Sequence, residues 1–268
     1  MSQVPLENVT ADAKVRPAAE PRRKLLWQSS RSRLSRRSLR DFDGDTLFDA
    51  VGRVVSEAEC LPRKELFESW EVASRVRRCV RGRPILELAA GHGLVAWLLL
   101  LLDTDTPGAR CVDRRKPASA ERLEAALVAR WPRLAGKVRW EVGDVRSVAA
   151  NADELVVAVH ACGSLTDRVL DTALAARAAV AVLPCCHGGA LGSRETAGLE
   201  AWMEGSLAVD AVRVLRLHAA GYRVWLRSIP EEITPENRLI VGVPEAPRGC
   251  LSVRPHQRSS SRSMRQDR

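Results

Sequence analysis

Aromatic residues and long apolar runs are both scarce in this sequence. Phenylalanine, tryptophan and tyrosine together make up 4% of the 268 residues. The longest uninterrupted apolar run covers residues 94–102, roughly half the length that a membrane-spanning helix requires. The first fourteen residues also lack the basic start and the apolar stretch of a secretory signal. We therefore expect a cytoplasmic protein that spans no membrane.

Cysteines are few and scattered. The seven cysteines, an odd number, are spread along the chain, which is not typical of a disulfide framework and indicates reduced thiols. Hydrophobic residues make up 46% of the sequence, a fraction that excludes wholesale disorder and collagen-like structure. The length suits one domain with loose ends, because two domains would have only about 130 residues each.

Acidic residues are almost missing from two stretches that carry most of the positive charge. The net charge is +9, and only five of the 42 basic residues are lysines. Residues 22–40 carry +8 and residues 248–268 carry +5, so the remainder has a net charge of −4. Such arms can bind an anionic polymer such as RNA with a strong salt dependence, or they can be solvated ends without a partner. We predict a disordered basic arm over 1–44, a folded domain over 45–247 and a disordered Arg/Ser-rich tail over 248–268.

The hydrophobic period of the sequence switches repeatedly between that of a helix and that of a strand. Two amphipathic helices are expected before the first strand, and short apolar strands then alternate with helices. This alternation indicates a doubly wound α/β sheet, whose ligands bind beyond the carboxyl ends of the strands. The predicted helices cover 46–60, 62–80, 94–102, 118–131, 165–176 and 195–219. The predicted strands cover 84–89, 109–113, 138–142, 154–160, 178–184, 222–229 and 238–243, the last two forming an antiparallel hairpin.

Glycines and acidic residues follow the first three predicted strands. Gly91 and Gly93 come after the first strand, where they allow a tight turn and a close approach of a ligand to the start of a helix. Asp113 ends the second strand, where a carboxylate can accept both hydroxyls of a ribose. Asp144 follows the third strand and is placed to receive an exocyclic amine such as that of adenine. Together these positions predict a nucleoside ligand held across the first three strands.

The segments ELAAGHG, CVDRR and VGDV resemble motif I, the ribose-binding acid and the adenine-side acid of class I S-adenosylmethionine-dependent methyltransferases. The resemblance implies a Rossmann-like, seven-stranded sheet with two preceding helices, and S-adenosylmethionine as the cofactor. The chain departs from the family at Ala89, where a glycine is usual. An NAD(P)-binding domain would instead have a third glycine at Ala96. The residues that the resemblance assigns to the cofactor are Glu87, Gly91, Gly93, Asp113 and Asp144.

Histidines and cysteines follow the fourth and fifth predicted strands. The segments HACGSLTD and PCCHGG, with ITPENRLIVG in the hairpin, resemble a methyltransferase group that includes the glutathione S-transferase C-terminal domain-containing protein. Transfer RNA 2′-O-methyltransferases are more distant relatives in this resemblance, which covers roughly residues 62–245. The Asn/Asp-Pro-Pro-aromatic segment of many amino-group methyltransferases is absent after the fourth strand, which makes exocyclic amines less favoured as acceptors.

The histidines and cysteines are expected to meet at the carboxyl edge, because the fourth and fifth strands are neighbours in this topology. One interpretation is a histidine that positions or deprotonates the methyl acceptor. A second is zinc, although the adjacent cysteines lack the usual CxxC spacing, and a third is a thiolate that adds to a pyrimidine ring. A fourth is that small residues simply let the sheet edge approach the cofactor. We assign no metal, and the predicted catalytic residues are His160, Cys162, Asp167, Cys185, Cys186 and His187.

The sequence thus predicts an S-adenosylmethionine-dependent methyltransferase that acts on RNA, with transfer RNA as the leading substrate and the basic arms as RNA contacts. Two alternatives stay open: an enzyme that methylates a small molecule or a protein, and a non-catalytic module that binds a nucleoside and RNA. One charged segment before the sheet also has two interpretations. Lys64, Glu65 and Glu68 either reach over the cofactor or form a solvated helix face.

Overall fold

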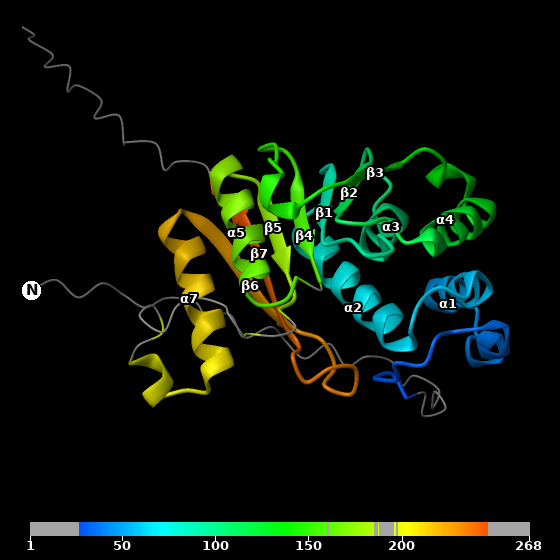
Figure 1. The fold of residues 1–268 in the computed structure, drawn as a ribbon, viewed down its shortest axis with the longest axis horizontal. Coiled ribbons are helices and arrows are strands. Elements are labelled where there is room, and N and C mark those ends of the chain that lie inside the picture. The colour runs from blue at the N-terminus through cyan, green and yellow to red at the C-terminus, as the bar shows by residue number, and fades with distance from the viewer. Residues whose placement is uncertain (1–26, 160, 185–186, 188–195, 197, 246–268) are drawn as a thin grey trace, which may run out of the picture.

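The computed structural model describes residues 27–159, 161–184, 187, 196 and 198–245 (Figure 1). Its helices are α1 (Leu47–Ala58), α2 (Arg63–Cys79), α3 (Leu94–Leu102), α4 (Ala118–Arg130), α5 (Ser164–Ala176) and α7 (Gly205–Ala219). Its strands are β1 (Ile85–Leu88), β2 (Ala109–Asp113), β3 (Val138–Val142), β4 (Leu155–Ala158), β5 (Ala179–Val182), β6 (Tyr222–Ser228) and β7 (Arg238–Pro244). Short 3-10 helices are η1 (Arg36–Asp41), η2 (Pro132–Leu134), η3 (Val145–Ser147) and η4 (Leu199–Ala201).

All seven strands form one sheet in the order β3-β2-β1-β4-β5-β7-β6. Strands β1 to β5 are parallel, whereas β7 runs antiparallel to both β5 and β6. This is the Rossmann-like sheet of class I methyltransferases, with α1 and α2 preceding it, and it confirms the predicted fold class. Because β1 lies at the point where the strand order reverses, the carboxyl ends of β1 and its neighbours form the edge at which a ligand binds.

Strands β4 and β5 are buried on both faces of the sheet, as their uninterrupted apolar sequences predict. Alternate residues such as Ile85 and Val157 pack with α1, α2 and α3. The intervening residues, such as Leu86 and Val156, pack with α5 and α7. A period of two therefore divides the apolar side chains between two cores. Figure 1 shows the resulting layers, with α5 and α7 at one side of the molecule and α1 and α4 at the other.

Residues before 45 pack into the folded domain, contrary to the sequence prediction. We expected disorder up to residue 44, but Leu34 and Phe42 are fully buried, so the predicted arm is wrong for this part of the chain. Backbone hydrogen bonds join Leu34 N to Leu61 O (2.9 Å), and an antiparallel bridge pairs Arg33 with Pro62. The apolar partners of this segment lie far along the chain, which is why its local composition resembles a flexible arm.

The predicted helix over 195–219 is also wrong at its start, because α7 begins only at Gly205. Gly198, with φ at +87°, precedes the short helix η4, and Glu204 then caps α7. The Glu204 carboxylate accepts hydrogen bonds from the amides of Ser206 (2.9 Å) and Leu207 (3.2 Å). A capping carboxylate satisfies amides that have no partner inside the helix and thereby fixes where the helix starts.

A buried ion-pair network joins α5 to α7. Arg213 on α7 is completely buried, and its guanidinium donates to both oxygens of Asp167 on α5 (3.0 and 3.1 Å) and to Asp210 (3.0 Å). Arg238 on β7 donates to the other oxygen of Asp210 (2.8 Å). The network therefore ties two helices and an antiparallel strand together.

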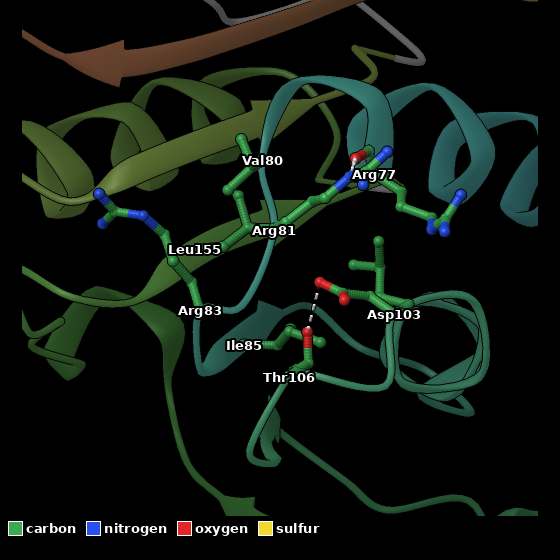
Figure 2. A pocket seen from close by; sticks show the side chains of 9 residues that line it. Arg77, Val80, Arg81, Arg83, Ile85, Asp103, Thr106 and Leu155 are labelled. Carbon is green, nitrogen blue, oxygen red and sulfur yellow. Dashed lines mark hydrogen bonds between the residues drawn. The ribbon is translucent and has the colours of Figure 1, made fainter.

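The amino-terminal edge of the parallel sheet is closed by polar contacts (Figure 2). Asp103, which follows α3, accepts hydrogen bonds from Gly82 N (2.7 Å) and Thr106 Oγ1 (3.0 Å). Arg81 Nε donates to the carbonyl of Arg77 (3.2 Å). The space enclosed there measures about 10 Å³, which is far too small for a nucleoside. Within the described residues, none of the helices combines the length and the apolar character needed to cross a membrane.

We predict that Arg213→Met lowers the free energy of unfolding by about 3 kcal/mol, because it removes the fully buried cation that Asp167 and Asp210 share. Arg216→Met is the matched control, since Arg216 is one turn away, 30% exposed and 3.6 Å from Asp167. It should cost less than about 1 kcal/mol. Urea denaturation followed by tryptophan fluorescence measures both values, and equal effects of the two substitutions would contradict the assignment.

Candidate cofactor-binding site

The turn between β1 and α3 has a left-handed backbone at three positions, with φ of +54° at Ala89, +54° at Gly91 and +70° at Gly93. The left-handed φ at Gly93 favours glycine, and a Cβ atom there would also crowd Cys111 Sγ and a ring carbon of Trp140, each 3.1 Å away. A Cβ atom at Gly91 would meet nothing within 4 Å, so the backbone there faces open space. Ala89 adopts a conformation that strains an L-residue, which is the physical consequence of its replacing the usual glycine.

Glu87, the middle of β1, forms the floor of this turn. It is almost completely buried, and its Oε2 accepts a hydrogen bond from the amide of Ala96 in the first turn of α3 (2.7 Å). Burial raises the pKa of Glu87 to about 8, although the Ala96 amide and the Cys111 thiol oppose this rise. One carboxyl oxygen of Glu87, a predicted cofactor-binding residue, therefore accepts a hydrogen bond from the first turn of α3.

Asp113 joins the end of β2 to the glycine turn. Its Oδ2 accepts a hydrogen bond from Gly91 N (2.9 Å), and its Oδ1 accepts a long one from Arg115 N (3.4 Å). The carbonyl of Asp113 also accepts from Gly143 N (2.9 Å), which brings the ends of β2 and β3 together. The carboxylate is half-buried beside the turn, at the position where the predicted ribose contact requires it.

Asp144 lies at the neighbouring strand end and caps η3. Its Oδ1 accepts a hydrogen bond from Arg146 N (3.0 Å), and its Oδ2 lies 3.6 Å from Arg114 Nη2. The Arg146 amide, and to a lesser degree the Arg114 guanidinium, lower the pKa of this carboxyl below its ordinary value. Asp144 is therefore an ionised acceptor at the rim, as a contact with an exocyclic amine requires.

A cavity of about 230 Å³ opens between the glycine turn and the start of α2. The sequence predicts one wall at Glu87 and Gly91, and on the opposite side it offers Glu65 as a residue that reaches over the cofactor. The lining residues that it did not single out include Ser69, Pro117 and Val159. Ser69 could have been found from the sequence, since it lies four residues after Glu65 and therefore on the same helix face.

His92, next to Gly91, lies in the cavity wall as a neutral ring. Its Nε2 is 2.8 Å from Ser119 Oγ, and its Nδ1 is 3.9 Å from Glu65 Oε1. Burial lowers the pKa of His92, and the positive charges of Arg33 and Arg122 lower it further. Arg33 belongs to the segment before α1, so this basic segment lies close enough to influence the cavity electrostatically.

Three of the six predicted catalytic residues, His160, Cys185 and Cys186, lie outside the described residues. Cys162 is exposed just before α5, where its carbonyl accepts from Leu165 N (3.2 Å). The parallel pairing of β4 with β5 confirms that the strands carrying these residues are neighbours. The predicted meeting of the histidine and cysteine side chains stays a prediction.

The other two predicted catalytic residues are held by charged partners. His187, after β5, has Nε2 3.0 Å from Asp210 Oδ1 and Nδ1 3.7 Å from Glu236 Oε2. Asp167 gives both carboxylate oxygens to Arg213, so in this structure it stabilises the packing of α5 against α7. Among the described residues, no three His, Cys, Asp or Glu side chains are arranged to hold a metal ion.

The geometry fits a nucleoside that carries an amino-acid chain. Gly91 faces open space, Asp113 and Asp144 present carboxylates at adjacent strand ends, and the cavity beside the turn is lined by polar groups from α2 and β1. An ionised carboxylate next to a glycine turn can accept ribose hydroxyls, and the exposed backbone allows close approach of the ligand.

We predict that Glu87→Gln flattens the pH dependence of folding stability. The pKa of Glu87 is higher in the folded chain than its ordinary value of 4.5. Its contribution to stability is therefore complete below pH 4.5 and is lost as the pH rises through about 8. The variant should match the wild type near pH 5 and exceed it by on the order of 2 kcal/mol near pH 8.5.

Urea titrations at pH 5, 7 and 8.5 measure this difference. Glu121→Gln is the control, because the Glu121 side chain is 74% exposed and should leave the pH profile of the wild type unchanged. A wild-type profile that coincides with that of Glu87→Gln would contradict the prediction.

One part of the chain matches a known protein family. Residues 70–190, less than half of the chain, match the family model described as a methyltransferase domain. No curated protein sequence matches the chain significantly.

Several solved structures are similar in fold. An O-methyltransferase family protein from Burkholderia thailandensis has 16% identity and a TM-score of 0.42, over 80% of this chain and 64% of that one. A Corynebacterium glutamicum protein has 16% identity and a TM-score of 0.48, over 79% of this chain and 97% of that protein. The tRNA (uracil-54, C5)-methyltransferase of Pyrococcus abyssi was solved with S-adenosyl-L-homocysteine. It has 15% identity and a TM-score of 0.42, over 68% of this chain and 39% of that protein. The chain spans less than two thirds of the first and third of these proteins.

The sheet has the Rossmann-like strand order, and residues 70–190 are similar to a methyltransferase domain.

Proposed function

We propose that the protein is an S-adenosylmethionine-dependent methyltransferase that acts on RNA, with transfer RNA as the first substrate to test. The observation that carries the proposal is the position of the basic segment over residues 30–40. Its backbone runs along the start of α2, with Lys64 N donating to Ser30 O (2.9 Å) and Arg63 N to Ser32 O (3.0 Å). The next residue, Glu65, lines the cofactor cavity. The basic segment is therefore attached beside the cavity.

The charges of this segment suit a phosphate backbone. Arg31, Arg33, Arg36, Arg37 and Arg40 are all exposed, and residues 31–40 include no acidic residue. In Figure 1 the segment, in blue, lies below α1 and α2, at the same end of the molecule as the loop between β6 and β7. A polyanion bound there would lie next to the transferable methyl group. The resemblance of the sequence to transfer RNA 2′-O-methyltransferases supports transfer RNA as the first choice.

The cofactor supplies an electrophilic methyl group on a sulfonium, and the residues of this chain would bind and orient it. Gly91 allows close approach, Asp113 would accept the ribose hydroxyls and Asp144 the adenine amine. His160, Cys162, Cys185, Cys186 and His187 are proposed to position the acceptor or to remove its proton. For His187 the Asp210 carboxylate at 3.0 Å would fix the ring orientation.

We predict that replacing Arg31, Arg36, Arg37 and Arg40 with alanine weakens RNA binding and reduces its salt dependence. Each lost phosphate contact with single-stranded RNA lowers the slope of log K against log salt by about 0.7, so four contacts would lower it by up to about 3. Filter binding of total transfer RNA between 50 and 300 mM salt measures the slope.

The matched control is the double variant Arg81→Ala, Arg83→Ala at the opposite edge of the sheet (Figure 2), which should bind RNA as the wild type does. An unchanged slope in the four-arginine variant would contradict the proposal. Methylation of a small molecule by that variant at the wild-type rate, with no methylation of RNA by either protein, would favour a small-molecule enzyme.

We predict that Asp113→Asn lowers the affinity for S-adenosylmethionine by roughly 10- to 100-fold, because a hydrogen bond to a charged group is lost. The asparagine oxygen still accepts from Gly91 N, so the turn is kept and only the charge is removed. Calorimetry measures the affinity. Asp153→Asn, in an exposed turn before β4, is the control, and equal affinities of both variants would refute the ribose-binding role.

A further inference from the structure

We propose that Glu65 is a cofactor-binding residue whose carboxylate binds the α-ammonium group of S-adenosylmethionine. The proposal rests on the methyltransferase function and adds to it the recognition of the methionine end by a residue from outside the sheet. Glu65 lies in the first turn of α2, before the segment that resembles motif I. Its side chain lines the same cavity as Glu87, Gly91 and His92.

The carboxylate of Glu65 faces the cavity without a partner that neutralises it. None of the described residues donates it a hydrogen bond, and His92 Nδ1 lies 3.9 Å from its Oε1. His92 is a poor cation because burial and nearby arginines lower its pKa. Lys64, the adjacent cation, forms its ion pair with Glu68 instead. A ligand with a positive charge would supply what the cavity wall lacks.

Other carboxyl groups near Glu65 make its ionisation unfavourable unless a positive charge is close by. Burial, followed by repulsion from Glu68, raises the pKa of Glu65 to about 7, against the attraction of Lys64. Glu65 in turn contributes to the raised pKa of Glu87 and of the buried Cys60 thiol. Two carboxyls that share a cavity cannot both ionise cheaply unless a cation enters between them.

Glu65 differs from Glu87 in having no structural task. Glu87 holds the amide of Ala96 at the start of α3, whereas the Glu65 side chain, 24% exposed, makes no such contact within the described chain. A partly buried carboxylate without a partner lowers stability. Glu65→Gln should therefore fold at least as stably as the wild type, so a loss of binding in this variant cannot be attributed to unfolding.

The experiment measures the binding of three ligands to the full-length wild type and to Glu65→Gln by calorimetry at pH 7. S-adenosylmethionine and S-adenosylhomocysteine both carry the α-ammonium group, and 5′-methylthioadenosine lacks the whole amino-acid end. The substitution should weaken the first two by about tenfold or more and by similar factors. It should leave 5′-methylthioadenosine unchanged. Glu71→Gln, on the same helix but outside the cavity lining, should bind all three ligands as the wild type does.

Proton linkage provides a readout that a structural role would not change. The ionised carboxylate is the binding form, so wild-type affinity should fall roughly tenfold between pH 7 and pH 5.5. At these pH values the α-amino group of the ligand stays protonated. Titrations in buffers of different ionisation enthalpy should show proton release at pH 7 for the wild type, and Glu65→Gln should lose most of it.

The outcomes separate this inference from the proposed function. If the folded wild type binds neither S-adenosylmethionine nor S-adenosylhomocysteine, the cofactor assignment itself fails. If both bind and Glu65→Gln binds them equally well, the cofactor site stands and the role of Glu65 is refuted. Loss of S-adenosylmethionine binding alone would also refute it, because the contact would then be with the sulfonium.

Discussion

The turn between β1 and α3 is the feature on which the rest of the site depends. Two carboxylates hold it from opposite sides: Glu87 binds the amide of Ala96 inside the sheet, and Asp113 binds the amide of Gly91 from the next strand. Backbone amides at a helix start are unsatisfied unless such groups reach them. With the turn fixed, the left-handed glycines expose the backbone where a cofactor approaches, and the ends of β1, β2 and β3 acquire a common geometry.

Much of the fold could be predicted because the information is local. Strands β4 and β5 consist of small and β-branched apolar residues, and a short run of that kind between helical segments is typical of a parallel strand buried on both faces. The ends of such strands then share one edge, which is why the cofactor contacts at Gly91, Asp113 and Asp144 could be proposed from order and spacing alone. The strain at Ala89, in contrast, could be recognised only from the backbone φ angle in the structure.

The errors arise where the deciding partner is distant in the sequence. Leu34 is buried only because Leu61 and the start of α2 provide an antiparallel neighbour, and nothing in residues 22–44 indicates this. The partner of Asp167 could not be predicted either, because Arg213 is 46 residues away on α7, and the catalytic role of Asp167 stays a prediction. Burial of an arginine cannot be predicted from a helical pattern, since long charged side chains usually lie at the surface.

The arrangement of charge at the site separates two kinds of ligand. Inside the cavity, Glu65 and Glu87 place two carboxyl groups in one wall, where the positive charge of an ammonium group would be stabilised. Outside the cavity, the arginines of residues 30–40 are exposed to solvent, where salt screens their charges over about 10 Å. The backbone pairing of residues 30–34 with 61–64 places these opposite environments next to each other. A cationic cofactor and a polyanionic acceptor would thus be attracted to adjacent places without competing for the same charges.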